Sequence, residues 1–299
     1  MADITLLDGA IGQELVHMNG KTPTPLWSTQ ILIDNPTLVA DLHEIYFKAG
    51  ASVATTNSYA VHRSRLKREN MEHRLEELLF ESAFQARKGL ERAGCSGRVA
   101  ASLGPLMASY RPDLEPDADI AETLYREMAT ALVDDSDFFL IETVSSIKEA
   151  EGALRGTKGF DKPVWIAFSV MDDDGARLRS GEQLTDIHAT IETHDPAAIL
   201  INCARPESIP AALDILAGFG KPFGAYANGF EKIEDAFLED APTVDVLTQR
   251  RDLGPEAYAA HAMAWVDQGA TIVGGCCEVG PAHIAQIAKE LIEAGHKIV

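Results

Sequence analysis

Eight short apolar runs, each followed by a segment with helical periodicity, are the feature that most constrains how this chain can fold. In chain order the runs are Ile4–Leu7, Ser52–Thr55, Val99–Ser102, Phe138–Ile141, Val164–Ser169, Ile199–Asn202, Phe223–Ala225 and Thr271–Gly274. Runs this short and this continuously apolar are typical of parallel strands that are buried on both faces. The sequence therefore predicts an α/β fold built on a parallel sheet.

The segments between the runs carry ordinary helix signals. Pro36–Lys48 begins with proline, keeps an apolar stripe and ends before Gly50, as helices commonly do. The other predicted helices are Met71–Ala93, Ala118–Val133, Ile147–Leu154, Leu184–Thr193, Pro206–Leu216, Pro255–Gln268 and Pro281–Ala294. This alternation favours a single (β/α)8 TIM barrel over an open sheet, with residues 1–299 as one domain,. The long segment Ala227–Leu253 predicts an elaborated loop after the seventh strand, over the barrel mouth,.

The charge balance narrows the possible partners. The chain has 26 basic and 46 acidic residues, a net charge of −20, which argues against nucleic acid or an anionic membrane as a partner. No run reaches the roughly 20 apolar residues of a membrane span, and the N-terminus lacks the pattern of a signal peptide. We expect a cytoplasmic protein that acts on small molecules.

Three of the four cysteines follow predicted strands. Cys203 follows the sixth strand, and Cys276 and Cys277 follow the eighth after a Gly-Gly pair. Four cysteines in so long a chain do not form a disulfide framework, and clustered thiols in a reducing compartment indicate a metal site or reactive groups. The remaining Cys95 lies between glycines in a predicted turn and is interpreted as an ordinary free cysteine.

The barrel prediction brings these three cysteines together, because only the seventh strand separates the sixth from the eighth. Zinc suits soft sulfur donors, and three protein ligands leave a fourth position for a substrate. A thiol bound at that position would lose its proton and become a nucleophile. Two carboxylates at the same rim, Asp8 and Glu142, are candidates to bind the ammonium group of an amino-acid thiol, although helix capping is an open alternative for Asp8.

The same motifs resemble the homocysteine S-methyltransferase family over almost the whole chain. The resemblance is carried by Leu7-Asp8-Gly9-Ala10-Ile11-Gly12, Thr55-Thr56-Asn57-Ser58-Tyr59, Ser102-Leu103-Gly104-Pro105, Ile141-Glu142-Thr143, Ile201-Asn202-Cys203 and Val273-Gly274-Gly275-Cys276-Cys277. The spaced Asn-Cys and Gly-Gly-Cys-Cys motifs are specific together, whereas the other pieces are weak individually.

The resemblance implies a (β/α)8 barrel that holds zinc on Cys203, Cys276 and Cys277 and transfers a methyl group to homocysteine, giving methionine. It implies that the carboxylates at positions 8 and 142 bind the homocysteine amino group and that backbone near Gly9 and Ala10 helps to hold the substrate. Asn57 belongs to the same rim and is included among the substrate-binding residues. Many members have arginine after the cysteine pair, whereas this chain has Glu278, which we expect to face solvent or to cap the following helix.

The methyl donor is the least constrained part of the prediction. The chain is too short to carry folate or cobalamin modules, and it lacks the cobalamin-ligand motif. A small onium compound such as S-methylmethionine or betaine needs no further cofactor, and its cationic centre is attracted to aromatic faces. Trp27 and Tyr59 match aromatic residues near the donor in the family, and ordinary packing is the alternative for both.

Two other interpretations remain open at this stage. One is a different zinc-barrel enzyme, either a hydrolase or an enzyme that acts on another thiol, although three thiolate ligands make zinc-bound water a poor acid. The other is a homocysteine-activating module that works only with a separate methyl-carrier partner protein.

Overall fold

We describe the protein from a computed structural model, which covers residues 1–233 and 247–299. Each predicted apolar run overlaps a strand: β1 (Asp3–Leu6), β2 (Val53–Thr55), β3 (Arg98–Leu103), β4 (Phe138–Val144), β5 (Val164–Phe168), β6 (Ala198–Asn202), β7 (Phe223–Ala227) and β8 (Ile272–Gly275). A short strand that the sequence did not predict, β9 (Lys297–Ile298), pairs with the start of β1.

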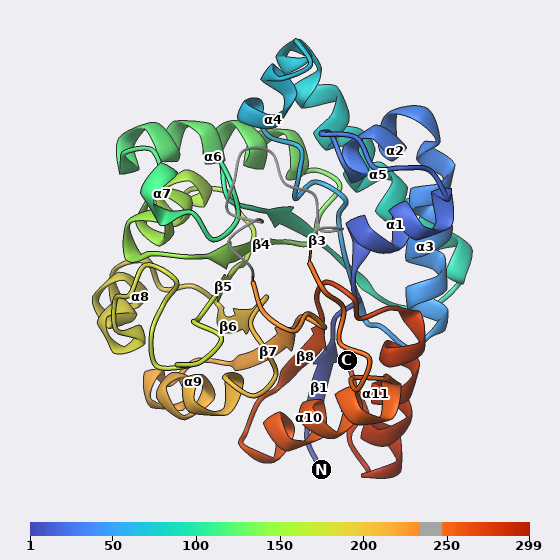
Figure 1. Cartoon of the computed structure of the whole chain (residues 1–299), viewed down its shortest axis with the longest axis vertical. Coiled ribbons are helices and arrows are strands. Elements are labelled where there is room, and N and C mark those ends of the chain that lie inside the picture. The colour runs from blue at the N-terminus through green and yellow to red at the C-terminus, as the bar shows by residue number, and fades with distance from the viewer. Residues whose placement is uncertain (234–246) are drawn as a thin grey trace.

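The strands form one curled parallel sheet in the order β2-β3-β4-β5-β6-β7-β8-β1-β9. Leu7, directly after β1, bridges Val53 of β2 in parallel, and the Ser52 amide donates to the Leu6 carbonyl at 2.8 Å. These contacts join β1 to β2 across the ends of the sheet order, an arrangement consistent with a TIM-type barrel. Figure 1 shows the strands at the centre with helices around them.

The helices are α1 (Ile11–Asn19), α2 (Ser28–Asp34), α3 (Pro36–Lys48), α4 (Arg63–Lys67), α5 (Leu75–Ala93), α6 (Ala118–Leu132), α7 (Ile147–Thr157), α8 (His188–His194), α9 (Ile209–Leu216), α10 (Pro255–Asp267) and α11 (Pro281–Glu293). The sequence did not predict α1, α2 or α4. These three are short, and α4 has a single apolar residue in five, so α4 carries no sustained apolar stripe,. Within the described residues, no helix combines the length and apolarity needed to cross a membrane.

Alternation along the strands decides which side chains face the centre of the sheet. On β4, Phe138 and Leu140 pack in a cluster made of residues from the strands, whereas Phe139 and Ile141 pack in the larger cluster that includes the surrounding helices,. Glu142 follows Leu140 by two residues and therefore continues the inward-facing series. The sequence predicted Glu142 just after this strand, whereas the structure places it inside β4. The register between β4 and β5 shifts at this point.

The predicted loop after the seventh strand is described only at its two ends. Asn228–Ile233 and Leu247–Gly254 are described, and a bridge between Phe230 and Gln249 pairs them. Residues 234–246, the middle of the segment predicted to cover the barrel mouth, lie outside the described residues.

Candidate metal centre and substrate pocket

The carboxyl ends of the strands surround a large pocket of about 960 Å³, including its opening to solvent. Every residue that the sequence indicated for the site lines this pocket: Asp8, Gly9, Ala10, Trp27, Asn57, Tyr59, Glu142, Cys203, Cys276 and Cys277. The fold therefore gathers them in one place, as expected for residues that follow parallel strands. Their individual roles stay predictions.

The three cysteine sulfurs converge at one side of the pocket. The Sγ atoms of Cys203, Cys276 and Cys277 all lie within 4.8 Å of one another. The intervening strand β7 holds both cysteine segments, because its Tyr226 carbonyl accepts from the Cys203 amide at 3.2 Å and its Ala227 carbonyl accepts from the Cys276 amide at 2.9 Å. Backbone hydrogen bonds thus fix the spacing of residues that are 73 positions apart.

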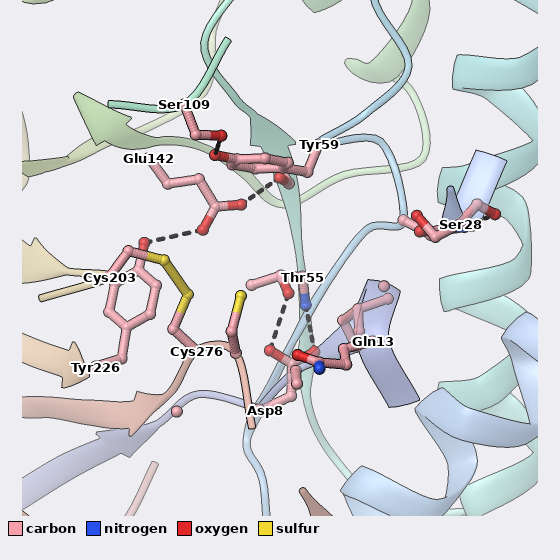
Figure 2. Close-up of a pocket in the computed structure, with 18 of the residues that line it drawn as sticks. Asp8, Gln13, Ser28, Thr55, Tyr59, Ser109, Glu142, Cys203, Tyr226 and Cys276 are labelled. Atoms are coloured by element: carbon pink, nitrogen blue, oxygen red, sulfur yellow. Dashed lines mark hydrogen bonds between the residues drawn. A yellow bond between two sulfur atoms is a disulfide. The ribbon is translucent and has the colours of Figure 1, made fainter. Parts of the chain in front are cut away.

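The bonding state of these sulfurs differs from the expectation of three free thiols. The structure joins Cys203 and Cys276 in a disulfide and leaves Cys277 free (Figure 2). The expectation considered only a bridge between the adjacent residues 276 and 277, and it was wrong for the longer-range pair because β6 and β8 bring those sulfurs into contact. A bonded pair supplies no thiolates, so this oxidised state and a metal-bound state use the same atoms in alternative ways.

The reduced form of this site fits a thiophilic metal. Burial, with the nearby charges of Glu278 and Glu142, raises the pKa of the Cys277 thiol to about 12. A thiolate here needs a compensating positive charge at neutral pH, and a divalent cation provides one. Three clustered sulfur donors with no histidine among them match zinc better than a hard cation such as magnesium,.

Glu142 faces the pocket with both carboxylate oxygens hydrogen-bonded. The Ser102 hydroxyl donates to Oε1, and the Tyr226 hydroxyl donates to Oε2 at 3.1 Å (Figure 2). Burial raises the pKa of Glu142, and these two hydrogen bonds oppose the shift. No cationic side chain among the described residues forms an ion pair with it, and its only hydrogen-bond donors there are the neutral hydroxyls of Ser102 and Tyr226.

Asp8 has a similar environment on the opposite side of the pocket. Thr55 donates to it twice, from the backbone amide to Oδ2 at 2.7 Å and from the hydroxyl to Oδ1 at 2.9 Å (Figure 2). Burial raises the pKa of Asp8 well above its ordinary value, the Thr55 hydrogen bonds lower it, and the charge of Glu142 raises it further. The alternative role as a helix cap is not seen, because Ala10 is the N-cap of α1 and no side chain caps that helix.

Strained backbone concentrates around the pocket. Among the described non-glycine residues with positive φ, Trp27 (50°), Tyr110 (62°) and Cys203 (50°) line it, and Thr143 (62°) follows Glu142 directly. A left-handed conformation is unfavourable for β-branched threonine. The Asn202 side chain holds it there by accepting from the Thr143 amide at 2.9 Å and donating to its hydroxyl at 3.0 Å. Such strain is typical of functional sites.

The aromatic residues Trp27 and Tyr59 form another part of the wall. The Trp27 ring covers Gly12 so closely that a Cβ at residue 12 would lie 2.3 Å from it. The Tyr59 hydroxyl is hydrogen-bonded to the Ser109 hydroxyl at 2.7 Å. Asn57 donates to the Ser28 carbonyl at 3.3 Å, which ties the end of β2 to the helix that follows Trp27.

Gly9 permits a close backbone approach that the cysteine segment needs. A Cβ at this position would lie 2.0 Å from the Val279 carbonyl oxygen and 3.0 Å from the Tyr46 hydroxyl. We expect Gly9→Ala to destabilise the protein by about 1–3 kcal/mol and to weaken metal retention, because the displaced Val279 donates its amide to the Cys276 carbonyl at 3.1 Å. Urea unfolding and metal analysis measure both effects. Gly218→Ala, where a Cβ meets nothing within 4 Å, is the matched control and is expected to change neither.

The expectation for Glu278 was wrong. Its side chain is half-buried and accepts a hydrogen bond from Gln13 of α1 instead of facing solvent. It does not cap α11 either, because Gly280 is the N-cap and its amide donates to His283 Nδ1 at 3.2 Å. The backbone of Glu278 is in the left-handed region, with φ of 64°.

Several lining residues were not identified from the sequence. They are mainly polar or aromatic side chains that contact the predicted site or complete its wall: Gln13, Thr55, Arg65, Ser102, Tyr110, Tyr226 and Phe230. Thr55 and Ser102 end predicted strands, and Tyr226 directly follows one. Their position at strand ends could therefore have indicated that they line the pocket. Arg65 and Gln13 come from the unpredicted helices α4 and α1 and gave no such signal.

Comparisons with known proteins place this chain among homocysteine S-methyltransferases. The family described as homocysteine S-methyltransferase matches residues 5–291. Homocysteine S-methyltransferase YbgG of Bacillus subtilis is 30% identical, over 95% of this chain and 93% of its own length. The metallated form of the homocysteine methyltransferase MmuM from Escherichia coli has a TM-score of 0.81 at 28% identity, with 96% of each chain covered. Its oxidized form has a TM-score of 0.79 at the same identity and coverage.

Proposed function

This chain belongs to the homocysteine S-methyltransferase family, and from that membership we propose that it transfers a methyl group from a small onium donor to the sulfur of L-homocysteine, giving methionine. The observation that carries the proposal is the convergence of three cysteine sulfurs within 4.8 Å in a pocket that also contains two buried carboxylates. A thiol acceptor with an amino group is complementary to both features.

In this proposal Cys203, Cys276 and Cys277 hold zinc, and the homocysteine sulfur takes the remaining ligand position. The metal supplies the positive charge that lets the substrate thiol lose its proton at neutral pH. The disulfide between Cys203 and Cys276 has to be reduced first. A cytoplasmic location agrees with this need, because glutathione and thioredoxin keep thiols reduced there.

Asp8 and Glu142 are proposed to bind the homocysteine ammonium group. Both carboxylates are buried and held by hydrogen bonds from neutral groups, namely Thr55 for Asp8 and Ser102 and Tyr226 for Glu142. Burial disfavours the ionised form of a carboxyl group that has no positive partner. A bound ammonium group would favour the ionised form again. The two acids would thereby orient the amino acid with its sulfur toward the cysteines.

Trp27 and Tyr59 are proposed to contact the onium centre of the donor. Their faces attract a sulfonium or quaternary ammonium ion by about 0.5–2 kcal/mol per contact. The homocysteine sulfur forms a bond to the donor methyl carbon as the bond from that carbon to the onium atom breaks. Its electron pair stays with the onium atom, which becomes neutral. The protein contributes alignment and exclusion of water.

A donor panel tests the proposal. Reduced, zinc-loaded protein is incubated with homocysteine and, separately, S-methylmethionine, betaine, dimethylsulfoniopropionate or S-adenosylmethionine, and methionine is quantified. We expect methionine with at least one donor; S-methylmethionine would give two methionines per transfer, because the demethylated donor is also methionine. Absence of product with every donor would contradict the proposal. The names and coverage of the relatives do not favour a hydrolase or a carrier-dependent module.

A further inference from the structure

Arg65 is the one lysine or arginine among the described residues that line the pocket, and no carboxylate of the described residues pairs with it. It lies on α4, where Nη1 donates to the Pro25 carbonyl oxygen at 2.8 Å. Its Nε is buried and has no hydrogen-bond partner in the described part of the chain. Most of its hydrogen-bonding capacity is therefore unused by the protein itself.

This isolation is unusual for the chain. The net charge is −20, and the neighbouring arginines have acidic partners: Arg63 pairs with Glu127, and Arg74 pairs with Glu77 at 2.6 Å. Burial lowers the pKa of Arg65, which means that its charge is held at a cost. A partly buried guanidinium that has no counter-ion among the described residues is unfavourable for stability,, and a bound anionic group would relieve that cost.

The position of Arg65 associates it with the aromatic wall. Its hydrogen-bond acceptor, Pro25, precedes Trp27 by two residues, and Tyr59 lines the same pocket as Arg65. These are the two aromatic residues proposed to contact the onium centre of the donor. A guanidinium offers two parallel N–H groups to a planar carboxylate, which makes it a better match for that group than for an isolated negative atom.

We propose that Arg65 binds the carboxylate of the methyl donor and so makes the enzyme selective for onium compounds that also carry a carboxylate. The inference rests on the proposed function and adds to it the chemical class of the donor. Trp27 and Tyr59 recognise the cationic end of such a zwitterion, and Arg65 recognises its anionic end. The acceptor is bound separately, with its ammonium at Asp8 and Glu142.

The first test uses the unaltered, reduced and zinc-loaded enzyme. Donors are compared in pairs that differ by the carboxylate: dimethylsulfoniopropionate with ethyldimethylsulfonium, and S-methylmethionine with its decarboxylated analogue. We expect kcat/KM to be about 10- to 100-fold higher for the carboxylated member of the pair that is used, the range typical of a charged hydrogen bond. Equal kcat/KM within the pairs would overturn the inference.

The second test uses Arg65→Gln and Arg65→Lys, with Lys67→Gln as a control that removes a positive charge from the exposed side of the same helix. We expect Arg65→Gln to raise the KM of the carboxylated donor about 10- to 100-fold, with Arg65→Lys intermediate because lysine keeps the charge but loses the planar fork. The KM values of the decarboxylated donor and of homocysteine should stay unchanged, as should all three values in the control. Thermal unfolding verifies that the variants are folded.

The outcomes separate the two possible carboxylates. A rise confined to the homocysteine KM would place the acceptor carboxylate at Arg65 and overturn the inference, as would an equal loss with both members of a donor pair. If either variant at position 65 fails to fold, the comparison of donor pairs in the unaltered enzyme still decides. Methionine formation without carboxylate discrimination would contradict this inference alone, whereas absence of methionine with every donor would contradict the proposed function as well.

Discussion

Replacing Cys203, Cys276 or Cys277 with serine is expected to abolish both zinc retention and methyl transfer. The three sulfurs lie within 4.8 Å of one another, and each is proposed to supply one of three protein ligands, which a serine hydroxyl does not replace at neutral pH. Loss of a group that merely supports a metal ligand costs about 10- to 100-fold, and loss of the ligand itself should exceed that. Elemental analysis after dialysis and a methionine assay measure the two effects.

Cys95→Ser is the control for these variants. Cys95 is exposed and free, and it lies outside the pocket, so its replacement should leave metal content and activity unchanged. The enzyme is reduced before loading, because the bridge between Cys203 and Cys276 removes two of the three thiolates. Full activity in a serine variant at position 203, 276 or 277, at normal metal content, would contradict the proposed metal centre.

Glu142→Gln is expected to weaken homocysteine binding while stabilising the metal-free protein. The amide keeps the size of the side chain and can still bond with Ser102 and Tyr226, but it loses the charge proposed to bind the ammonium. The loss of one charged hydrogen bond corresponds to a rise of about 10- to 100-fold in the homocysteine KM. The donor KM should change little. Steady-state kinetics with each substrate varied in turn provides the measurement, and an unchanged homocysteine KM would contradict the role of Glu142.

The stability effect follows from the direction of the pKa shift. Burial raises the pKa of Glu142 in the folded protein above its value in the unfolded chain. Its contribution to stability is therefore fully present below the unfolded pKa, about 4.3, and is lost as the pH rises through the higher folded value. Glu142→Gln removes this loss, so the variant should be more stable than the parent near neutral pH and should show a weaker decline as the pH rises.

Urea unfolding of the metal-free, reduced protein at a series of pH values measures this effect. Glu91→Gln, which changes an exposed glutamate on α5, is the matched control and should reproduce the parent's pH dependence. If Glu142→Gln also reproduces it, the buried carboxyl is not the source of the decline. A gain in stability together with a loss of substrate affinity would identify Glu142 as a residue retained for function.

Some secondary-structure elements carry a local signal in the sequence and were predictable from it. The strands were predicted because a buried parallel strand has to be apolar on both faces, and the runs at Phe138–Ile141 and Ile199–Asn202 show this directly,. Helix α3 was predicted with its observed bounds, Pro36–Lys48, because proline and a following glycine mark its ends. Helix α4 was not predicted because it has five residues and a single apolar side chain, so its stability depends on tertiary contacts,.

The sequence by itself determined the chemistry available at the site. Soft sulfur donors, a strand-end carboxylate at position 142 and a Gly-Gly pair before two cysteines specify a thiophilic metal and a thiol substrate, because these properties belong to side-chain types and their order along strands. Only the tertiary structure decided which groups meet. It bonded Cys203 to Cys276, turned Glu278 toward Gln13 and placed Arg65 in the pocket wall with no acidic partner among the described residues. Such contacts depend on distances of a few ångströms between segments far apart in the chain, and no local pattern of residues encodes those distances.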